Sequence, residues 1–341
     1  MSGAPLLEVR DLSVSFRTQD GTVHAVDGVS FSVSRGEVLG IVGESGSGKS
    51  VTAMTLMRLI LDQNAVFSGE VLFKGRDLMQ LSQGDMLQVR GKQISMIFQD
   101  PMTSLNPVYR VGWQIDEQLR AHEGLSAKQA RRRTLELLGA VGIPNPEARI
   151  DDYPHQFSGG MRQRVMIAMG LSCNPDVLIA DEPTTALDVT VQAQILDLIR
   201  DLQKEFGSAV IMITHDLGVV AELADDLLVM YAGKAVEQGS ADDLFLRPEH
   251  PYTWGLLSSV PRIDRSTTDR LVPIQGSPPS LINVPSGCAF HPRCPYAART
   301  EGKSISQVPS LVESTRTHLV ACHLDTAQRR AIWADEIAPR L

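Results

Sequence analysis

The segment Gly43-Glu-Ser-Gly-Ser-Gly-Lys-Ser50 constrains the fold of this chain more than any other feature. It fits G-x-x-x-x-G-K-[ST] and lies between the continuous apolar run Val38–Val42 and a helical pattern over residues 49–60. This context distinguishes a phosphate-binding loop from a glycine-rich turn that merely ends a strand. Backbone N–H groups of such a loop point toward phosphate oxygens, Lys49 would reach the β- and γ-phosphates, and Ser50 would ligate Mg²⁺. We therefore predict nucleotide binding by Gly43, Glu44, Ser45, Gly46, Ser47, Gly48, Lys49, Ser50 and Val51.

A strand that ends in two carboxylates, Asp176-Val-Leu-Ile-Ala-Asp-Glu-Pro183, supplies the remaining chemistry. Asp181 at the strand tip can hold Mg²⁺ through its water shell, and Glu182 can polarise the water that attacks the γ-phosphate. An acidic turn after a strand is common in isolation. Combined with the phosphate-binding loop, the two carboxylates indicate a P-loop NTPase.

Alternating strands and helices favour an α/β fold with a parallel core. The first 35 or so residues alternate apolar and polar positions, which predicts an antiparallel β subdomain with one solvated face. Buried strands are predicted at 38–42, 177–180 and 209–213. Between about residues 100 and 173 the strand signals stop, and an inserted α-helical subdomain is predicted, with helices over 111–122, 127–141 and 160–171.

Composition excludes several classes of protein. The 341 residues carry a formal charge of −8, so no global charge draws the chain to nucleic acid or anionic lipid. No apolar stretch approaches the roughly 18 residues of a membrane span, and the start lacks the pattern of a signal peptide, so we expect a cytosolic location. Four cysteines are too few for a disulfide scaffold, and Cys173 is expected in the core.

A second anion-binding element is predicted at Phe157-Ser-Gly-Gly-Met-Arg-Gln163. Ser158 is a good N-cap, and Gly159 and Gly160 would expose N–H groups at the start of a helix. Two phosphate-binding surfaces but one loop make sense if two chains enclose the nucleotide, each contributing half of the site.

With these elements the chain resembles the ATP-binding subunits of ABC transporters over about residues 6–260, and weakly beyond. Ser158, Gly159 and Gly160 match the signature motif of that family, although Phe157 and Met161 replace its commoner Leu and Gln. The resemblance implies an ABC ATPase domain over 1–246, with the helical subdomain inside it, and a small Pro- and Cys-containing extension over 247–341. Seven prolines between residues 248 and 285 predict an extended appendage rather than a second α/β domain.

The resemblance also assigns roles to four residues outside these motifs. Phe16 would stack on adenine, and Gln99 would touch Mg²⁺ and link to the membrane partner. Asp188 would cross the dimer interface, and His215 would contact the γ-phosphate, which makes Lys49, Glu182 and His215 the catalytic residues. Alone, Phe16 is more readily a core residue and His215 an ordinary buried or surface histidine; their joint order along the chain carries the assignment.

Three longer strings, at 99–107, 181–195 and 250–254, resemble the ATPases of oligopeptide/dipeptide importers, a branch that includes nickel importers. The implied function is an ATP-hydrolysing subunit that powers peptide uptake by ATP-driven dimer closure, peripheral on the cytoplasmic side of the cell membrane. The implied partners are two transmembrane permease subunits, which would contact a groove over 100–125, a second ABC ATPase subunit of the same or a different kind, and indirectly an extracytoplasmic solute-binding protein, with no nucleic acid. Nickel or another small solute, or a soluble non-transport ABC ATPase, remain the alternatives.

Three cysteines gather in the C-terminal extension: Cys288, Cys294 and Cys322. Some members of the importer branch hold an iron–sulfur cluster at four cysteines there, so a [4Fe-4S] cluster or Zn²⁺ is implied as a candidate. A cubane cluster normally requires four thiolates, and Glu301 stands where relatives place a further cysteine. The remaining ligand could be a histidine, which would equally suit zinc, or the cysteines could bind no metal. The candidate histidines are His291, His318 and His323.

Overall fold

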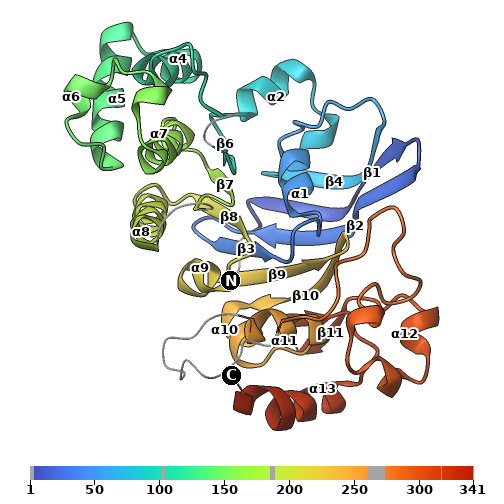
Figure 1. Ribbon diagram of the computed structural model, residues 1–341. Coiled ribbons are helices and arrows are strands. Elements are labelled where there is room, and N and C mark those ends of the chain that lie inside the picture. Colours follow the sequence, from blue (N-terminus) through green and yellow to red (C-terminus); the bar gives the residue numbers. More distant parts are fainter. Residues whose placement is uncertain (1–3, 101–103, 185–188, 260–272, 316, 341) are drawn as a thin grey trace. The chain divides into compact units, whose positions relative to one another are not determined.

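The computed structural model describes residues 4–100, 104–184, 189–259, 273–315 and 317–340. The chain divides into two units, each assembled from segments that lie far apart in the sequence (Figure 1). The first unit comprises Met1–Leu7, Val33–Glu37 and Phe73–Met212. The second unit comprises Glu8–Ser32, Val38–Leu72 and Ile213–Leu341.

The N-terminal strands of the second unit form the predicted antiparallel sheet. Its strands run in the order β2-β1-β4, and their bounds are Leu7–Thr18 for β1, Gly21–Val33 for β2 and Ala65–Phe73 for β4. Val9 and Leu12 are both buried although they lie three positions apart, which would place them on opposite faces of a regular strand. Asp11, whose φ is 47°, lies between them and acts as a bulge that returns the apolar side chains to the same face.

The phosphate-binding loop follows a strand of a second, larger sheet. Here β3 (Val38–Val42) pairs in parallel with β9 (Asp226–Tyr231), and β9 pairs antiparallel with β10 (Lys234–Ser240). All five residues of β3 are buried, as the continuous apolar run predicts. The loop leads into α1 (Lys49–Leu56), and α9 (Leu217–Leu223) precedes β9.

The described part of the C-terminal region, residues 247–340, is folded, so the prediction of an extended appendage was wrong. Its strands β12 (His318–Val320) and β11 (Val312–Thr315) extend the large sheet beyond β10. A small apolar core is formed by Trp254, Tyr296, Leu324 and Ile332. The helices near and within this region are α10 (Ala241–Leu246), α11 (Pro251–Ser258), α12 (Lys303–Ser306) and α13 (Thr326–Ile332), with shorter turns at His291–Arg293, Ala297–Thr300, Trp333–Ile337 and Ala338–Arg340.

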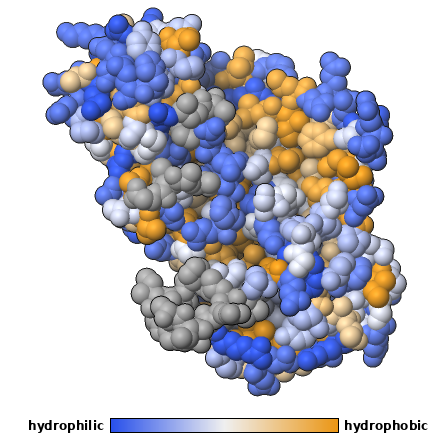
Figure 2. Space-filling model, in the orientation of Figure 1, coloured by the Kyte–Doolittle hydropathy of each residue, from blue (hydrophilic) through white to orange (hydrophobic). Residues whose placement is uncertain are grey.

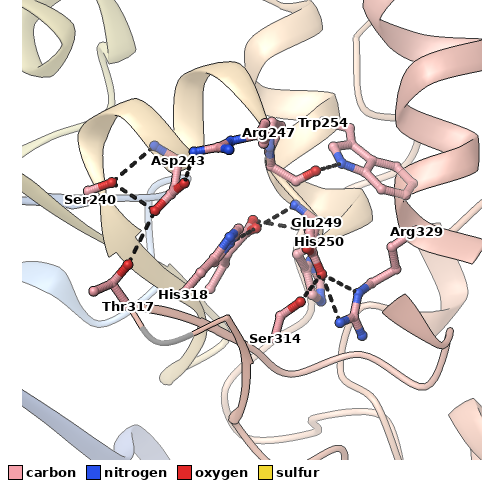
Figure 3. A network of polar contacts seen from close by, with 12 residues as sticks. Ser240, Asp243, Arg247, Glu249, His250, Trp254, Ser314, Thr317, His318 and Arg329 are labelled. Atoms are coloured by element: carbon pink, nitrogen blue, oxygen red, sulfur yellow. Dashed lines mark hydrogen bonds and ion pairs between the residues drawn. The ribbon is translucent and has the colours of Figure 1, made fainter. Parts of the chain in front are cut away.

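Two buried carboxylates, Glu237 and Glu249, stabilise this region, and Figure 3 shows Glu249 beside Ser314 and Arg329. Glu237 on β10 accepts hydrogen bonds from the backbone N–H groups of Glu249 and His250, and its Oε1 lies 2.8 Å from Nε2 of His318. Glu249 forms ion pairs with Arg329 on α13 at 2.8 Å and with Arg330 at 3.0 Å. Each buried carboxylate therefore has hydrogen-bond partners, and these contacts join elements distant in sequence.

The first unit holds the strands that carry the carboxylate pair. β6 (Ile94–Ile97) pairs in parallel with β7 (Val177–Asp181), and β8 (Ala209–Thr214) is the next strand after β7 in the sheet. β7 and β8 confirm the other two predicted buried strands. Short elements precede them: β5 (Arg76–Asp77), a 3₁₀ turn at Leu78–Gln80 and α2 (Gln83–Val89).

Helices dominate the middle of the first unit, as predicted. α4 (Val111–Glu123) packs against α5 (Ala127–Ala140) and α7 (Gly159–Leu171). In the sequence, α6 (Pro146–Arg149) and a turn at Pro154–Gln156 lie between α5 and α7. α8 (Val189–Phe206) precedes β8. Cys173 is buried just after α7, where burial raises the pKa of its thiol, in keeping with a core residue.

On the face shown in Figure 2, the helical part of the first unit is mostly hydrophilic. Of the helices in the described ranges, none combines the length and the apolar character needed to cross a membrane.

Candidate functional site

The phosphate-binding loop requires glycine at two positions for steric reasons. Gly43, Gly46 and Gly48 have φ values of 153°, 80° and 102°. A Cβ atom on Gly43 would lie 2.2 Å from the carbonyl oxygen of Met230, and one on Gly48 would lie 2.3 Å from that of Ala25. The backbone at Ala25 and Met230 thus packs directly against the loop and leaves no room for a side chain at Gly43 or Gly48.

Lys49 lies inside this loop with only 4% of its surface exposed. Its Nζ donates to the carbonyl oxygens of Gly43 at 2.7 Å and Glu44 at 2.9 Å, and lies 3.4 Å from Oγ of Ser47. Ser50 follows in the first turn of α1 and is half-buried. The loop therefore presents one ammonium group, one hydroxyl and the start of a helix to the same small region, which suits a polyphosphate.

Two residues of the C-terminal region contact the loop, and no local pattern in the sequence indicates either of them. Arg293 forms an ion pair with Glu44 in which both ends of the guanidinium reach the carboxylate. The hydroxyl of Tyr252 accepts a hydrogen bond from the N–H of Glu44 at 2.7 Å. Arg293 lies in the segment 287–294, which also contains Cys288 and Cys294. No local pattern in that segment indicates a contact with Glu44, which is far away in the sequence.

The carboxylate pair lies at the carboxyl end of β7. Asp181 is buried, with 4% exposed, and Glu182 follows with a φ of 47°. Because β6 and β7 are parallel and Ile97 pairs with Ala180, the residues after both strands meet at one edge. There the Nε2 of Gln99 donates to Oε2 of Glu182 at 2.9 Å. Within the first unit the structure therefore brings Gln99 and Glu182 together.

The signature segment forms the start of α7, as predicted. Ser158 is the N-cap, and its Oγ accepts from the backbone N–H three residues on at 3.3 Å. Ser158 and Gly159 are exposed and Gly160 is half-buried, so this helix N-terminus is open to an anion. Gln163, on the next turn, is buried and donates to the carbonyl oxygen of Pro183, which ties α7 to the segment after the carboxylate pair.

The other predicted residues occupy separate elements. His215 is exposed directly after β8, beside Asp216, the N-cap of α9. Phe16 is half-buried on β1, so part of its ring is available for stacking, and Val51 is half-buried in the first turn of α1. Asp188 lies outside the described residues.

Each unit therefore carries its own share of the residues predicted to bind and hydrolyse a nucleotide. The second unit carries the phosphate-binding loop, Phe16 and His215. The first unit carries Gln99, the two carboxylates and the signature helix. Lysine, backbone amides and helix N-termini bind phosphates, and a carboxylate beside a metal ligand activates water.

The three C-terminal cysteines line one small cavity of about 20 Å³. Burial raises the pKa of Cys288; burial, with a smaller contribution from neighbouring cysteines, raises the pKa of Cys294 to about 12 and that of Cys322 to about 11. The structure thus brings Cys322 together with Cys288 and Cys294, which lie far from it along the chain.

The residues around this cavity do not form a metal site. His291 and His323 line the cavity, and one ring nitrogen of each is engaged: Nδ1 of His291 lies 3.0 Å from the carbonyl oxygen of Cys288, and Nε2 of His323 lies 2.8 Å from that of Gln307. His318 is bound to Glu237 instead. Throughout the described ranges, no group of three or more His, Cys, Asp or Glu side chains is arranged to hold a metal ion. The donor set therefore does not fit a four-ligand cluster or zinc.

Two family models match the chain. A model described as ABC transporter matches residues 26–185, and one described as Oligopeptide/dipeptide transporter, C-terminal region, matches residues 236–300. The second match spans β10 and the first part of the folded C-terminal region.

Curated relatives match over nearly the whole chain. The oligopeptide transport ATP-binding protein OppD of Bacillus subtilis is 55% identical over 316 residues, which cover 92% of this chain and 87% of that protein. The dipeptide transport ATP-binding protein DppD of Lactococcus lactis subsp. cremoris is 51% identical over 342 residues, covering 100% and 97%. OppD of Salmonella typhimurium is 56% identical over 292 residues, covering 86% and 87%.

Solved structures share the fold. The dimeric, post-hydrolysis structure of the ATP-binding cassette MJ0796 bound to ADP and Pi has a TM-score of 0.62 at 26% identity, and covers 69% of this chain and 98% of that chain. The structure of cbiO1 from Clostridium perfringens, part of the ABC transporter complex cbiONQ, has a TM-score of 0.60 at 31% identity, covering 71% and 91%.

Proposed function

Because this chain belongs to the family of ATP-binding subunits of oligopeptide and dipeptide ABC transporters, we propose that it hydrolyses ATP to power the uptake of di- and oligopeptides across the cytoplasmic membrane. The observation that carries the chemistry is the position of Glu182, beside Asp181 at the end of β7 and hydrogen-bonded to Gln99. A carboxylate held in this way is suited to polarise water rather than to stabilise the fold.

ATP would be held at the phosphate-binding loop. Lys49 and the loop amides bind the β- and γ-phosphates, and Phe16 supplies a ring face for the adenine. Ser50, Gln99 and Asp181 are oxygen donors that would hold Mg²⁺, which they fit by chemistry. When bound, this ion neutralises the charge that develops on the phosphate oxygens.

A second ATPase subunit would complete the site. The exposed N-terminus of α7, with Ser158 and Gly159, would bind the γ-phosphate of a nucleotide held by the partner, and Asp188 would lie at the dimer interface. His215 would contact the γ-phosphate within its own subunit. ATP then favours the closed dimer through these contacts, and hydrolysis through Glu182 removes them, so that the dimer opens.

The surface after Gln99 is suited to the permease subunits. Val108, Tyr109 and Trp113 are 71%, 44% and 46% exposed, and the two aromatic rings stack with their centroids 4.2 Å apart. Exposed aromatic side chains of this kind mark protein interfaces. We therefore propose that this part of residues 100–125 receives the transmembrane subunits, which places the chain peripherally at the cytoplasmic face and only indirectly in contact with a solute-binding protein.

The Glu182→Gln variant tests the catalytic assignment. It should bind MgATP as the wild type does, hydrolyse it about 100-fold more slowly or worse, and form a stable dimer with ATP, because only the water-polarising carboxylate is lost. Steady-state phosphate release and size-exclusion chromatography measure both effects. Glu70→Gln, at an exposed ion pair on β4, is the matched control and should behave as wild type. Unchanged turnover in the Glu182 variant would remove the proposed role.

The solute is tested in proteoliposomes that contain the chain with its permease subunits and binding protein. Labelled di- and oligopeptides should accumulate in an ATP-dependent manner, and Ni²⁺ should not. Accumulation of Ni²⁺ without peptide would replace the peptide by the metal as cargo.

Metal binding by the three C-terminal cysteines stays a prediction that a direct analysis can test. A [4Fe-4S] cluster or Zn²⁺ at Cys288, Cys294 and Cys322 would require a fourth ligand that the described residues do not offer. Iron and zinc analysis of anaerobically purified protein decides the matter, and the absence of both metals ends this prediction.

A further inference from the structure

Arg293 is a buried cation whose side chain is directed to the phosphate-binding loop. Only 5% of the side chain is exposed, although the residue belongs to a region far beyond the loop in the sequence. Its two terminal nitrogens meet the two carboxylate oxygens of Glu44 at 2.5 and 3.0 Å. This bidentate geometry is the strongest arrangement available to the pair and fixes the orientation of both side chains.

The remaining surroundings hold the guanidinium in place. Its Nε donates to the carbonyl oxygen of Gln275 at 3.0 Å, and one terminal nitrogen donates to that of Gly276 at 3.2 Å. The group also lies over the rings of Tyr231 and Phe290, at 5.8 and 6.0 Å from their centroids. Because a buried cation is costly without partners, this set of contacts commits Arg293 to Glu44.

Glu44 is therefore fixed at three points. Arg293 binds its carboxylate, the hydroxyl of Tyr252 accepts from its N–H at 2.7 Å, and its carbonyl oxygen accepts from Nζ of Lys49 at 2.9 Å. Tyr252 is fully buried and packs against Tyr231 with ring centroids 4.7 Å apart, so its hydroxyl has little freedom to move. Two of the three anchors come from the C-terminal region, and the third is the lysine that binds phosphate.

Arg299 offers a comparison within the same region. It lies over the ring of Tyr296 at 5.0 Å and pairs with Glu336 at 3.1 Å, entirely within the C-terminal region. It has the same two kinds of contact as Arg293, a carboxylate and an aromatic ring. The two arginines differ in the location of the carboxylate, and also in burial, since half of the Arg299 side chain is exposed against 5% of the Arg293 side chain.

We propose that Arg293 and Tyr252 are positioning residues of the ATP site: by holding Glu44, they fix the backbone of the phosphate-binding loop and the carbonyl group that orients Lys49. The C-terminal region thereby sets the affinity of this subunit for ATP. This inference rests on the proposed function, because it requires that the loop binds ATP.

Substitution of Arg293 by Met tests the inference, with Arg299→Met as the matched control. In the wild-type protein MgATP binding and hydrolysis are measured first. In R293M the KM for ATP and the Kd for MgATP should rise about 10-fold, the loss expected for one charge-assisted hydrogen bond, while kcat changes less than about twofold. R299M should leave both constants unchanged. A purely structural role would instead lower kcat with the fraction of folded protein and leave KM as it was.

Glu44→Gln and Tyr252→Phe keep the test decisive if R293M folds poorly. Each removes one anchor with little change in volume, and each should raise KM in the same direction. In a double-mutant cycle, R293M should add nothing further in the E44Q background, because both act through the same contact. Wild-type protein that binds no MgATP overturns the proposed function and this inference with it. Normal wild-type binding together with an unchanged KM in R293M, E44Q and Y252F overturns this inference alone.

Discussion

Gly48 and Glu182 both have a positive φ, at 102° and 47°, but for different reasons. At position 48 any side chain would collide with the carbonyl oxygen of Ala25, so the position accepts glycine alone. At position 182 a side chain is present, and the conformation costs on the order of 1–2 kcal/mol. The hydrogen bond from Gln99 offsets part of this cost. Because Asp11 has the same φ of 47° at a bulge of β1, the assignment of Glu182 rests on its place at the end of β7 and on its hydrogen bond from Gln99.

Gly48→Ala should therefore be damaging, and Gly36→Ala provides the control. Gly36 has a φ of 74°, but a Cβ atom added there would meet nothing within 4 Å, so alanine should cost about 1 kcal/mol in the free energy of unfolding. Gly48→Ala adds a backbone collision and should cost about 3 kcal/mol or more and weaken ATP binding. Urea denaturation and nucleotide titration measure the two effects, and equal costs at the two sites would contradict the steric argument.

At the scale of elements, the C-terminal region depends on buried polar contacts as much as on its small apolar core. Glu249, 2% exposed, follows α10 and accepts hydrogen bonds from Ser314 on β11 and from Arg329 and Arg330 on α13. Burial alone would raise the pKa of Glu249, but these hydrogen bonds outweigh it and hold the pKa below its ordinary value. One carboxylate thus joins three elements.

This contact makes stability depend on pH. Because the folded pKa of Glu249 is lowered, its contribution is fully present above the ordinary value of 4.5 and is lost as the pH falls through the folded pKa. Glu249→Gln should lower the free energy of unfolding by about 3 kcal/mol at pH 7, and the difference from wild type should shrink below pH 4.5. Denaturation at several pH values gives the comparison, with the exposed Glu313→Gln as control. A deficit that stays constant with pH would rule out the charge on Glu249 as its cause.

At the scale of the whole molecule, the proposed function depends on a surface around Trp113 that the isolated chain leaves exposed. Trp113 stacks on Tyr109 and is not among the buried core residues of the described ranges, so it has little to do with folding. Its value lies in the assembly with permease subunits, where a half-exposed aromatic pair can be covered.

Trp113→Ala should separate hydrolysis from transport. The isolated variant should keep its melting temperature within about 2 °C and its ATPase activity, because an exposed side chain is lost. Reconstituted with permease subunits, it should bind them at least about 10-fold more weakly, as expected for an interface anchor. Leu61→Ala, at a side chain that is 84% exposed, is the control. It should keep its melting temperature, its ATPase activity and its binding to the permease subunits. Wild-type assembly by the Trp113 variant would place the permease contact elsewhere.

The strands, the phosphate-binding loop and the signature helix were predictable because each rests on local periodicity or on a motif in its proper context. The role of Gln99 came only from the family resemblance, and its hydrogen bond to Glu182 was not predicted, because it joins the ends of two strands that lie far apart in the sequence. The carboxylates, the loop and His215 thus lie on the elements that the sequence predicts.

The C-terminal region could not be predicted in the same way. Its core residues Trp254, Tyr296, Leu324 and Ile332 are widely spread along the chain and form no periodic pattern, whereas the prolines between them are conspicuous. The contact of Arg293 with Glu44 spans 249 positions. Contacts of this kind depend on how distant segments pack, which no window of the sequence records.

The two short strands that the C-terminal region adds to the large sheet have a consequence for solubility. Without β12, the seven residues of β10 would present unpaired backbone N–H and C=O groups along an open border. Such a border is a template for pairing with other chains and so for aggregation, and proteins commonly shield it. Here β12 pairs with Glu237 and Gln238 in the middle of this border, and β11, only four residues long, leaves a short outer border in its place. A chain truncated after His250 would lose this protection together with both anchors of its nucleotide loop, Tyr252 and Arg293.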